Sequence, residues 1–297
     1  ANIRFPENLI WTIGFSDQLI TDTSADLHEF NPKLGVQWAV NEQISLRAAA
    51  FQVVTNPANV TYQTIEPTQV AGFNQFFDDY AATVSKNYGA ALDIKFSPRL
   101  FGGLGALRRD LEVPFGTLDT PDFYEIDQQQ IDQYGAYLYW MPSQRWAVKA
   151  AGVYENFEVK EGLLPLLFTS PPLPSQLRTI TLPLDIQYFD PSGFFAGLGM
   201  VYVNQRVQFA DPQSFNPVDP SSSSLSFLPM QSESFTLLNA GLGYRLPKRW
   251  GLIALQGNNL TDRKFRYQDN SFRTTDNTVN PLYIPERTIF GRVIINF

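Results

Sequence analysis

The sequence predicts an all-β protein: a transmembrane, antiparallel, up-and-down β-barrel with about twelve strands in this chain. Three observations lead to this fold class. Apolar and polar side chains alternate along many segments, very short turns alternate with long loops, and apolar residues are abundant while charges are few. Hydrophobic residues make up 44% of the 297, aromatic residues 14% and charged residues only 17%. Such a composition predicts that apolar surface covers part of the outside.

The composition also bounds the alternatives. No stretch of about 18 consecutive apolar residues occurs, which excludes a helical membrane protein. The net charge is −7 and Lys and Arg are not clustered, which argues against a nucleic-acid partner. Nothing marks a domain junction, so residues 1–297 are expected to form one domain. The apolar strand pattern begins almost at Ala1, and we expect a signal peptide to have been removed upstream.

Alternation with a period of two justifies the strands in order, because a strand between lipid and a polar lumen must send every second side chain to each side. In each segment one face is mainly apolar and the other carries the charges. After an opening strand near Leu9–Ser16, the clearest segments are Leu34–Val40, Ile44–Phe51, Tyr88–Phe96, Trp146–Glu155, Ile180–Tyr188, Leu238–Arg245 and Ile289–Phe297.

The connections alternate in length. Five are predicted as short turns rich in Pro, Gly, Asn and Asp: Asn41–Gln43, Ser97–Arg99, Pro142–Arg145, Asp190–Gly193 and Leu246–Arg249. Short periplasmic turns and long extracellular loops are typical of outer-membrane barrels. An opening strand, five hairpins and a closing strand give the predicted count.

Aromatic residues beside the short turns predict a girdle at the lipid interface. Its members are Trp38, Phe96, Trp140, Trp146, Tyr188, Phe194, Tyr244 and Trp250. The alternative is a soluble β-sandwich or barrel with an ordinary core. It is less favoured, because one face of almost every strand holds Arg, Lys or Asp while the other is apolar.

The charged face is the one constellation with a functional argument behind it. Its predicted lumen-lining members are Arg47, Asp93, Lys95, Arg109, Lys149, Glu155, Asp185, Arg245 and Arg292. In a closed barrel these side chains either line an aqueous path or pair with one another and fill the interior. Three apolar loop segments, Phe73–Phe77, Leu163–Phe168 and Leu225–Met230, either fold inward as a constriction, dock against a partner or pack on other loops.

The sequence predicts no catalytic residue, no cofactor and no metal site. The single histidine, His28, lies in the first long loop and cannot build a two-histidine motif. No nucleophile elbow accompanies it, and we expect the protein not to be an enzyme. Carboxylates gather in three groups that could offer oxygen ligands to calcium: Asp17, Asp22 and Asp26; Asp78 and Asp79; and Asp119, Asp122, Glu125 and Asp127. Solvated acidic loops are the favoured explanation.

Several motifs resemble a known family. FNPKLGVQW at residues 30–38 and NNLTDRKFRYQD at 258–269 resemble the C-terminal half of TonB-dependent-receptor-type barrels. RTIFGRVIINF, ending at Phe297, is similar to the signal that the barrel assembly machinery recognises. Residues 65–79 and 108–114 resemble segments of barrels fused behind periplasmic tetratricopeptide repeats. The resemblance implies a bacterial outer-membrane location, with outer-membrane lipids, lipopolysaccharide and that machinery as partners, and a tetratricopeptide-repeat domain or another envelope protein as a further one.

The resemblance covers most of the chain but not two family features, a plug domain and a TonB box, so it does not by itself imply TonB-driven import. Full receptors close with about 22 strands, and this chain is expected to be either a smaller barrel or the C-terminal part of a longer one. Three functions remain open: a porin- or exporter-like conduit, which is preferred; a scaffolding barrel with a filled lumen; and the barrel part of a TonB-dependent receptor.

Overall fold

A computed structural model describes residues 1–22, 25–55, 69–76, 79–80, 82–116, 124–161, 174–211, 226–267 and 286–296. The main feature is a 13-stranded antiparallel sheet whose strands follow one another in chain order. It contains β1 (Asn2–Arg4), β2 (Leu9–Asp22), β3 (Ala25–Ala39), β4 (Ile44–Val54), β7 (Val84–Ser97), β8 (Leu100–Gly116), β9 (Tyr124–Ser143), β10 (Trp146–Glu161), β11 (Pro174–Phe189), β12 (Phe194–Phe209), β13 (Gln231–Arg245), β14 (Gly251–Asn258) and β15 (Thr288–Ile295). The short strands β5 (Gln69–Val70) and β6 (Phe73–Asn74) form a separate hairpin.

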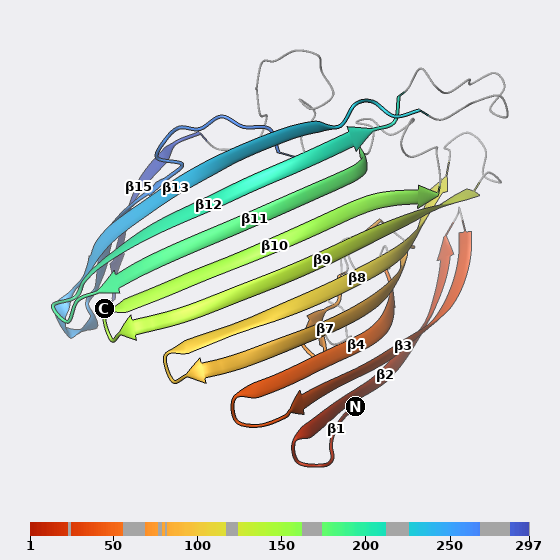
Figure 1. Cartoon of the computed structure of the whole chain (residues 1–297), viewed down its shortest axis with the longest axis horizontal. Helices are drawn as coiled ribbons and strands as arrows, with labels where there is room; N and C mark the ends of the chain where they lie inside the picture. The colour runs from red at the N-terminus through yellow and green to blue at the C-terminus, as the bar shows by residue number, and fades with distance from the viewer. Residues whose placement is uncertain are drawn as a thin grey trace.

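The sheet is a wide, curved wall (Figure 1). Its antiparallel, up-and-down order confirms the predicted fold class. The twelve expected strands are all present, and β1, which pairs with β2 from Asn2 to Arg4, is a thirteenth that the sequence pattern did not reveal. In the described part of the chain no pairing joins β1 to β15, so both edges of the wall are free. Nowhere do the described residues form a helix with the length and apolar character needed to cross a membrane.

The five predicted short turns are confirmed, and all lie at one end of the wall, here called the short-turn end; the opposite end is the loop end (Figure 1). Side-chain oxygens stabilise four of these turns. Ser97 Oγ and Ser143 Oγ accept from the backbone N–H groups of Arg99 and Arg145, both at 3.2 Å. Asn41 Oδ1 accepts hydrogen bonds from the backbone N–H groups of Gln43 and Ile44, both at 2.8 Å. Asp190 accepts from the N–H of Ser192 at 3.0 Å. Such Asx-type turns reverse the chain within few residues and fix the register of each hairpin.

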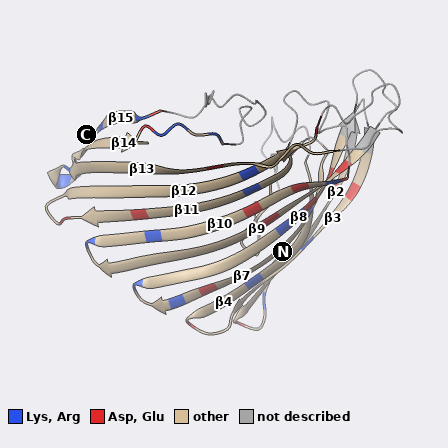
Figure 2. Ribbon diagram, turned by 45° about the horizontal axis from the view of Figure 1, so that its top comes forward, with Lys and Arg blue, Asp and Glu red and all other residues tan. Residues whose placement is uncertain are grey.

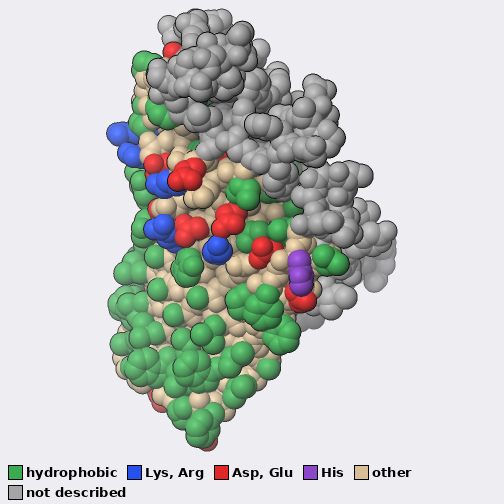
Figure 3. Space-filling view, turned by 90° about the vertical axis from the view of Figure 1, so that its right-hand side faces the viewer, with side chains coloured by type: hydrophobic (Ala, Val, Ile, Leu, Met, Phe, Trp, Pro, Cys, Tyr) green, Lys and Arg blue, Asp and Glu red, His purple; other side chains and the backbone are tan. Residues whose placement is uncertain are grey.

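The convex face carries an apolar band next to the short-turn end. On β12 the band runs from Phe194 to Tyr202, about nine residues, which suffices for a tilted strand to cross the hydrocarbon of a bilayer. Its side chains are exposed, for example Leu198 at 53% and Leu242 at 52%. Figure 3 shows hydrophobic side chains toward the turn that joins β1 to β2, and Lys, Arg, Asp and Glu between them and the grey residues.

The strands continue past this band. β9 has 20 residues and β8 has 17, more than the hydrocarbon requires. Beyond the band the convex face becomes polar, with Lys86, Arg108, Asp110, Glu112, Asp132, Asn156, Glu158, Lys160, Arg178, Asn204 and Arg206 in successive strands. We call these residues the polar belt. The wall therefore has a part that matches the membrane and a part that rises above it.

Candidate functional site

The concave face gathers the charged residues that the alternation singled out. The pairing register places all nine of them there: Arg47, Asp93, Lys95, Arg109, Lys149, Glu155, Asp185, Arg245 and Arg292. One row of directly opposite residues runs from Arg47 through Ala91, Gly105 and Gly135 to Val153. Each of the nine is an even number of residues from this row or a parallel row, so their side chains share the face. Figure 2 shows where charged residues lie along the strands.

Three strands bring a polar cluster together on this face. The Arg47 guanidinium forms an ion pair with Asp93 at 2.8 Å, from β4 to β7. The hydroxyl of Tyr137, on β9, donates to Asp93 Oδ1 at 2.6 Å. Arg47 also donates from Nη1 to the carbonyl oxygen of Gly72 at 3.3 Å. The carboxylate is thus held by a cation and a hydroxyl, and the guanidinium reaches beyond the sheet to the hairpin.

The other charged residues on the face are separate from this cluster. Lys149 and Asp185 are directly opposite in the register, but the Lys149 amine lies 5.9 Å from the centre of the Tyr139 ring instead. The Arg245 guanidinium lies 5.6 Å from the Phe189 ring and 5.7 Å from the Phe195 ring. Glu155 accepts from Gln133 at 3.4 Å. Lys95 and Arg292 are exposed on the same face.

A row of small residues makes room for a loop on this face. Gly35, Ala49 and Gly89 are directly opposite one another across β3, β4 and β7. Residues 69–76 and 79–80, here called the first inward segment, lie over this row. A Cβ atom on Gly35 would lie 2.6 Å from the Ala71 Cβ, and one on Gly89 would lie 2.5 Å from the Phe73 ring. Only glycine permits this approach, so the row is a cradle for the segment.

Charge and aromatic contacts fix the far end of the first inward segment. Asp79 forms an ion pair with Arg109 of β8, and the two side chains are only 14% and 8% exposed. The Arg109 guanidinium also lies 4.3 Å from the centre of the Phe76 ring. Val70, Ala71 and Phe73 of the segment form one buried cluster with Ala49, Phe51 and Val53 of β4. Of the alternatives for Phe73–Phe77, the structure shows the inward fold; Phe77 lies outside the described residues.

A second stretch folds onto the concave face beside β12 and β13, and the sequence reasoning missed it. Residues 259–267, the second inward segment, follow β14. Phe265 stacks on Phe235 with the ring centres 3.8 Å apart. Glu233, 13% exposed, lies 3.5 Å from Arg263 and 3.7 Å from Arg266. The available signal was the alternation of cations and aromatics in RKFRY, which is too polar to be lipid-facing and too aromatic for a loop surrounded only by water.

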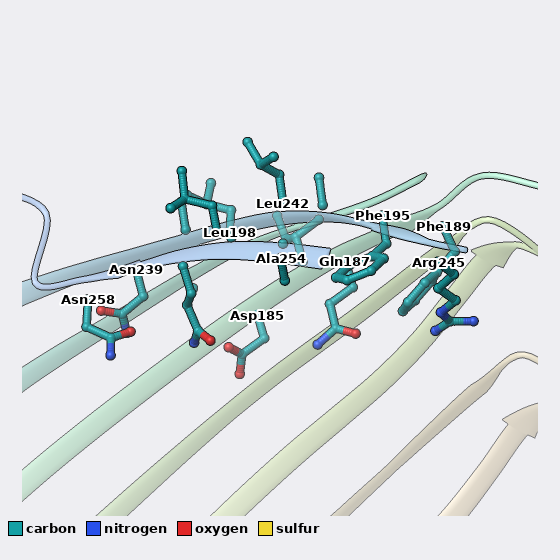
Figure 4. Close-up of a pocket in the computed structure, with 18 residues that line it drawn as sticks. Asp185, Gln187, Phe189, Phe195, Leu198, Asn239, Leu242, Arg245, Ala254 and Asn258 are labelled. Atoms are coloured by element: carbon teal, nitrogen blue, oxygen red, sulfur yellow. The ribbon is translucent and has the colours of Figure 1, made fainter. Parts of the chain in front are cut away.

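Between this segment and the short-turn end, the concave face holds an open polar pocket (Figure 4). Asp185 and Gln187 of β11, Asn239 of β13 and Asn258 at the end of β14 point to one side of the sheet, whereas Leu198 and Leu242 point to the other. The pocket offers amide, carboxylate and guanidinium groups with the aromatic rings of Phe189 and Phe195. It can form hydrogen bonds with a polar solute, and we find no arrangement of a nucleophile and a base in it.

The predicted interface aromatics lie near the short-turn end. Trp38, Phe96, Trp140, Trp146, Tyr188, Phe194 and Tyr244 are on the convex face, and Trp250, which is 64% exposed, follows the 3-10 turn Pro247–Arg249. Sequence reasoning missed a second set at the opposite edge of the apolar band, formed by Tyr88, Tyr134, Tyr154 and Tyr202. Each is the last aromatic residue on its face before the polar belt. The change from apolar to polar residues on that face of the alternating pattern could have predicted this second set.

The other predicted positions that the structure describes do not form a site. Asp17, His28 and Asp127 were predicted to lie in loops, but they lie in β2, β3 and β9. His28 Nε2 lies 2.9 Å from Asp17 Oδ1, with both side chains largely exposed. The described residues contain no group of three or more potential metal ligands. Asp78, Asp119, Asp122, Leu163–Phe168 and Phe297 lie outside the described residues, so their predicted roles stay predictions. Leu225 is also outside the described residues. In the rest of the predicted segment Leu225–Met230, Leu228 packs against the buried Val207 and Phe209, while Phe227 is 48% exposed.

Comparisons with known proteins agree with this architecture. Residues 1–260 match the model of the TonB dependent receptor-like β-barrel family. The FrpB iron transporter from Neisseria meningitidis is similar over 96% of this chain, with a TM-score of 0.61 and 13% identity. The ferripyoverdine receptor of the outer membrane of Pseudomonas aeruginosa is similar over 90% of this chain, with a TM-score of 0.57 and 14% identity. No curated protein sequence matches the chain. The similar region spans 42% of the first structure and 34% of the second.

Proposed function

Because this chain belongs to the TonB-dependent receptor-like β-barrel family of the bacterial outer membrane, we propose that it forms part of the wall of a barrel that passes a solute across that membrane. The observation that carries the proposal is the division of the wall into two faces. The nine predicted lumen-lining residues all lie on the concave face. The convex face is apolar along about nine residues of a strand such as β12, which is enough to cross the hydrocarbon. A water-filled path on the concave side explains both.

The free edges of the wall support a larger, closed barrel. The unpaired N–H and C=O groups of an edge strand cannot be satisfied by lipid, and each costs several kcal/mol in hydrocarbon. The edges formed by β1 and β15 therefore require further strands. The barrel part of a TonB-dependent receptor, as in the larger structures to which the chain is similar, meets this requirement.

The first inward segment would act as a constriction. It lies over β3, β4 and β7, and it brings Arg47, Asp93 and Tyr137 beside the hairpin. A solute that passes along this wall would meet this cluster and then the polar pocket with Asp185 and Asn239. The solute would be selected by hydrogen bonding and charge, because these groups bind polar molecules without forming covalent bonds. We expect no catalytic activity.

A second candidate is the scaffolding barrel with a filled lumen. The observation that favours it is internal pairing: two inward segments cover parts of the concave face, and Arg47 and Arg109 both pair with carboxylates of the chain itself. A tetratricopeptide-repeat partner, suggested by residues 65–79 and 108–114, would suit either candidate. Recognition of Phe297 by the assembly machinery, and contact with lipopolysaccharide, would suit both as well.

Conductance separates the candidates. The complete polypeptide that contains this chain would be inserted into planar bilayers, as wild type and with residues 69–80 deleted. We expect ion currents that grow on deletion, and a change of ion selectivity when Arg47→Gln removes a fixed positive charge. Glu42→Gln, in a short turn outside the concave face, is the matched control and should leave selectivity unchanged. Silence of both the wild type and the deletion variant would overturn the conduit and support the scaffold.

A further inference from the structure

The polar belt of the convex face contains two arginines that face each other across strands β11 and β12. Arg178 and Arg206 are directly opposite in the register, and both side chains are exposed. Figure 2 shows the two basic positions side by side near the loop end of these strands. Residues directly opposite on one face have Cβ atoms about 5 Å apart, and like charges in this position are destabilising. Such a pair is favourable when an anion lies between the two side chains.

Three other cations of the polar belt have carboxylate partners. Lys86 lies 2.7 Å from Glu112, Arg108 lies 3.0 Å from Asp110, and Lys160 lies 2.7 Å from Glu158. These cations on β7, β8 and β10 are thus neutralised by carboxylates of the chain. Among the residues that the structure describes, no carboxylate lies within 4.0 Å of the guanidinium of Arg178 or Arg206. The positive charge on β11 and β12 is therefore not compensated locally.

The surroundings of the pair add neutral hydrogen-bonding groups. Arg178 donates from Nε to Asn156 Oδ1 at 3.2 Å, which orients its side chain. Ser232 is directly opposite Arg206 on the next strand, and Asn204 is two residues from Arg206 on the same face. Two guanidinium groups with hydroxyl and amide donors match the tetrahedral oxygens of a phosphate group, because guanidinium groups form paired hydrogen bonds with phosphate.

The apolar band beneath the pair indicates where that phosphate comes from. Toward the short-turn end, the next convex-face residues are Ile180 and Asn204, followed by the pair Leu182 and Tyr202 and then by Met200. Leu182 and Met200 are 44% and 36% exposed. A phosphate between the arginines would lie at the headgroup level, with acyl chains along these apolar side chains. We propose that Arg178 and Arg206 bind the phosphate of a phosphorylated lipid headgroup in the leaflet at the loop end. This site does not depend on whether the lumen conducts.

Binding would be measured on the complete polypeptide in uncharged detergent, with lipopolysaccharide as the probe and a dephosphorylated preparation as its control. We expect Arg178→Gln or Arg206→Gln to weaken binding about tenfold, as for the loss of one charge-assisted hydrogen-bonding group. Arg108→Gln removes a belt arginine that has its own carboxylate, and it should change binding less than about twofold. Equal binding of the dephosphorylated lipid, or competition by millimolar inorganic phosphate, would overturn the lipid site.

The unfolding temperature gives a second readout, because the effect of Arg206→Gln on it should differ without and with lipid. Without lipid, Arg206→Gln removes a repulsion, so the variant should unfold at the same temperature as the wild type or higher. With lipopolysaccharide present, the wild type should gain more stability than the variant, because a ligand stabilises the state that binds it. A variant that is less stable in both conditions, with unchanged lipid affinity, would show that the arginines are structural and would overturn the proposal.

Discussion

The two inward segments lie on the same concave face but are held by different kinds of interaction. The first inward segment depends on absent side chains, at Gly35 and Gly89, and on one ion pair that is largely buried. The second depends on aromatic surface, with Phe265 stacked on Phe235, and on ion pairs from Glu233 to Arg263 and Arg266 that are longer. The glycine row and the buried ion pair hold the first inward segment in one arrangement, so it is either bound or released. The stacking that holds the second inward segment weakens gradually as the aromatic contact area decreases. We therefore expect an abrupt release of the first segment and a graded release of the second.

Asp79→Ala should have the largest effect, since it leaves the Arg109 charge largely buried without its ion-pair partner. Removal of one member of a buried ion pair typically costs about 3 kcal/mol or more. The first inward segment should then leave the concave face, where water can solvate Arg109. The sequence has no cysteine, so a single cysteine in place of Gln75, which is 6% exposed, reports the release by its rate of thiol labelling.

The matched control for this change is Asp110→Ala. Asp110 also accepts from an arginine, Arg108, but both side chains are exposed on the convex face. Exposed ion pairs contribute little, so labelling at position 75 should stay at the wild-type rate. If Asp79→Ala labels no faster than Asp110→Ala, the buried ion pair does not hold the segment.

Gly89→Ala should come next in size. The added Cβ would lie 2.5 Å from the Phe73 ring, and overpacking of this kind costs about 1–3 kcal/mol. The same labelling assay should show release, and Phe73→Ala in the Gly89→Ala background should abolish the steric part of the cost. Gly105→Ala is the control, because its nearest neighbour would lie at 3.8 Å. Equal and additive effects of Gly89→Ala and Phe73→Ala would contradict the cradle.

Phe265→Ala tests the second inward segment. Loss of a stacked, buried ring should cost about 2 kcal/mol and expose Val203, which is 6% exposed beneath it. A cysteine at position 203 should label faster as more of the side chain at position 265 is removed, first in Phe265→Leu and then in Phe265→Ala. Phe227→Ala, at a ring that is 48% exposed, should leave this rate unchanged. An abrupt change already at Phe265→Leu would remove the distinction between the two segments.

The sequence predicted the wall far better than what lies on it. Alternation identifies strand segments such as Trp146–Glu155 and the face of Arg47 and Asp93, because each residue's environment depends on its own position in the strand. The strand register places Tyr137 of β9 beside Asp93 of β7, and no local sequence pattern predicts this contact. The cradle was also invisible, since Gly35 and Gly89 are far apart in sequence and resemble ordinary small residues. β1 was missed because three residues are too few to show a period.

The smallest expected effect concerns two turns at the short-turn end. The turn between β11 and β12 contains Asp190, whose carboxylate accepts hydrogen bonds chiefly from the Ser192 backbone N–H, and also from Ser192 and Tyr188 side chains; these lower its pKa from 3.8 to about 2. Because the folded pKa is depressed, this stabilisation is present above 3.8 and is lost as the pH falls toward 2. The turn between β3 and β4 uses the neutral Asn41, which has no corresponding titration.

Asp190→Asn should therefore flatten the decline of unfolding stability between about pH 4 and about pH 2, measured by denaturant unfolding in detergent. Asn41→Asp should steepen it, because its carboxylate would accept the two N–H groups that Asn41 now binds and would lose them on protonation. Asp190 lies in a surface turn and its side chain is partly exposed, at 28%, so both changes should be small beside those at Asp79 or Gly89. A pH profile that neither substitution alters would show that the two turns are equivalent. The two parts of the wall would then differ only in the segments folded onto them.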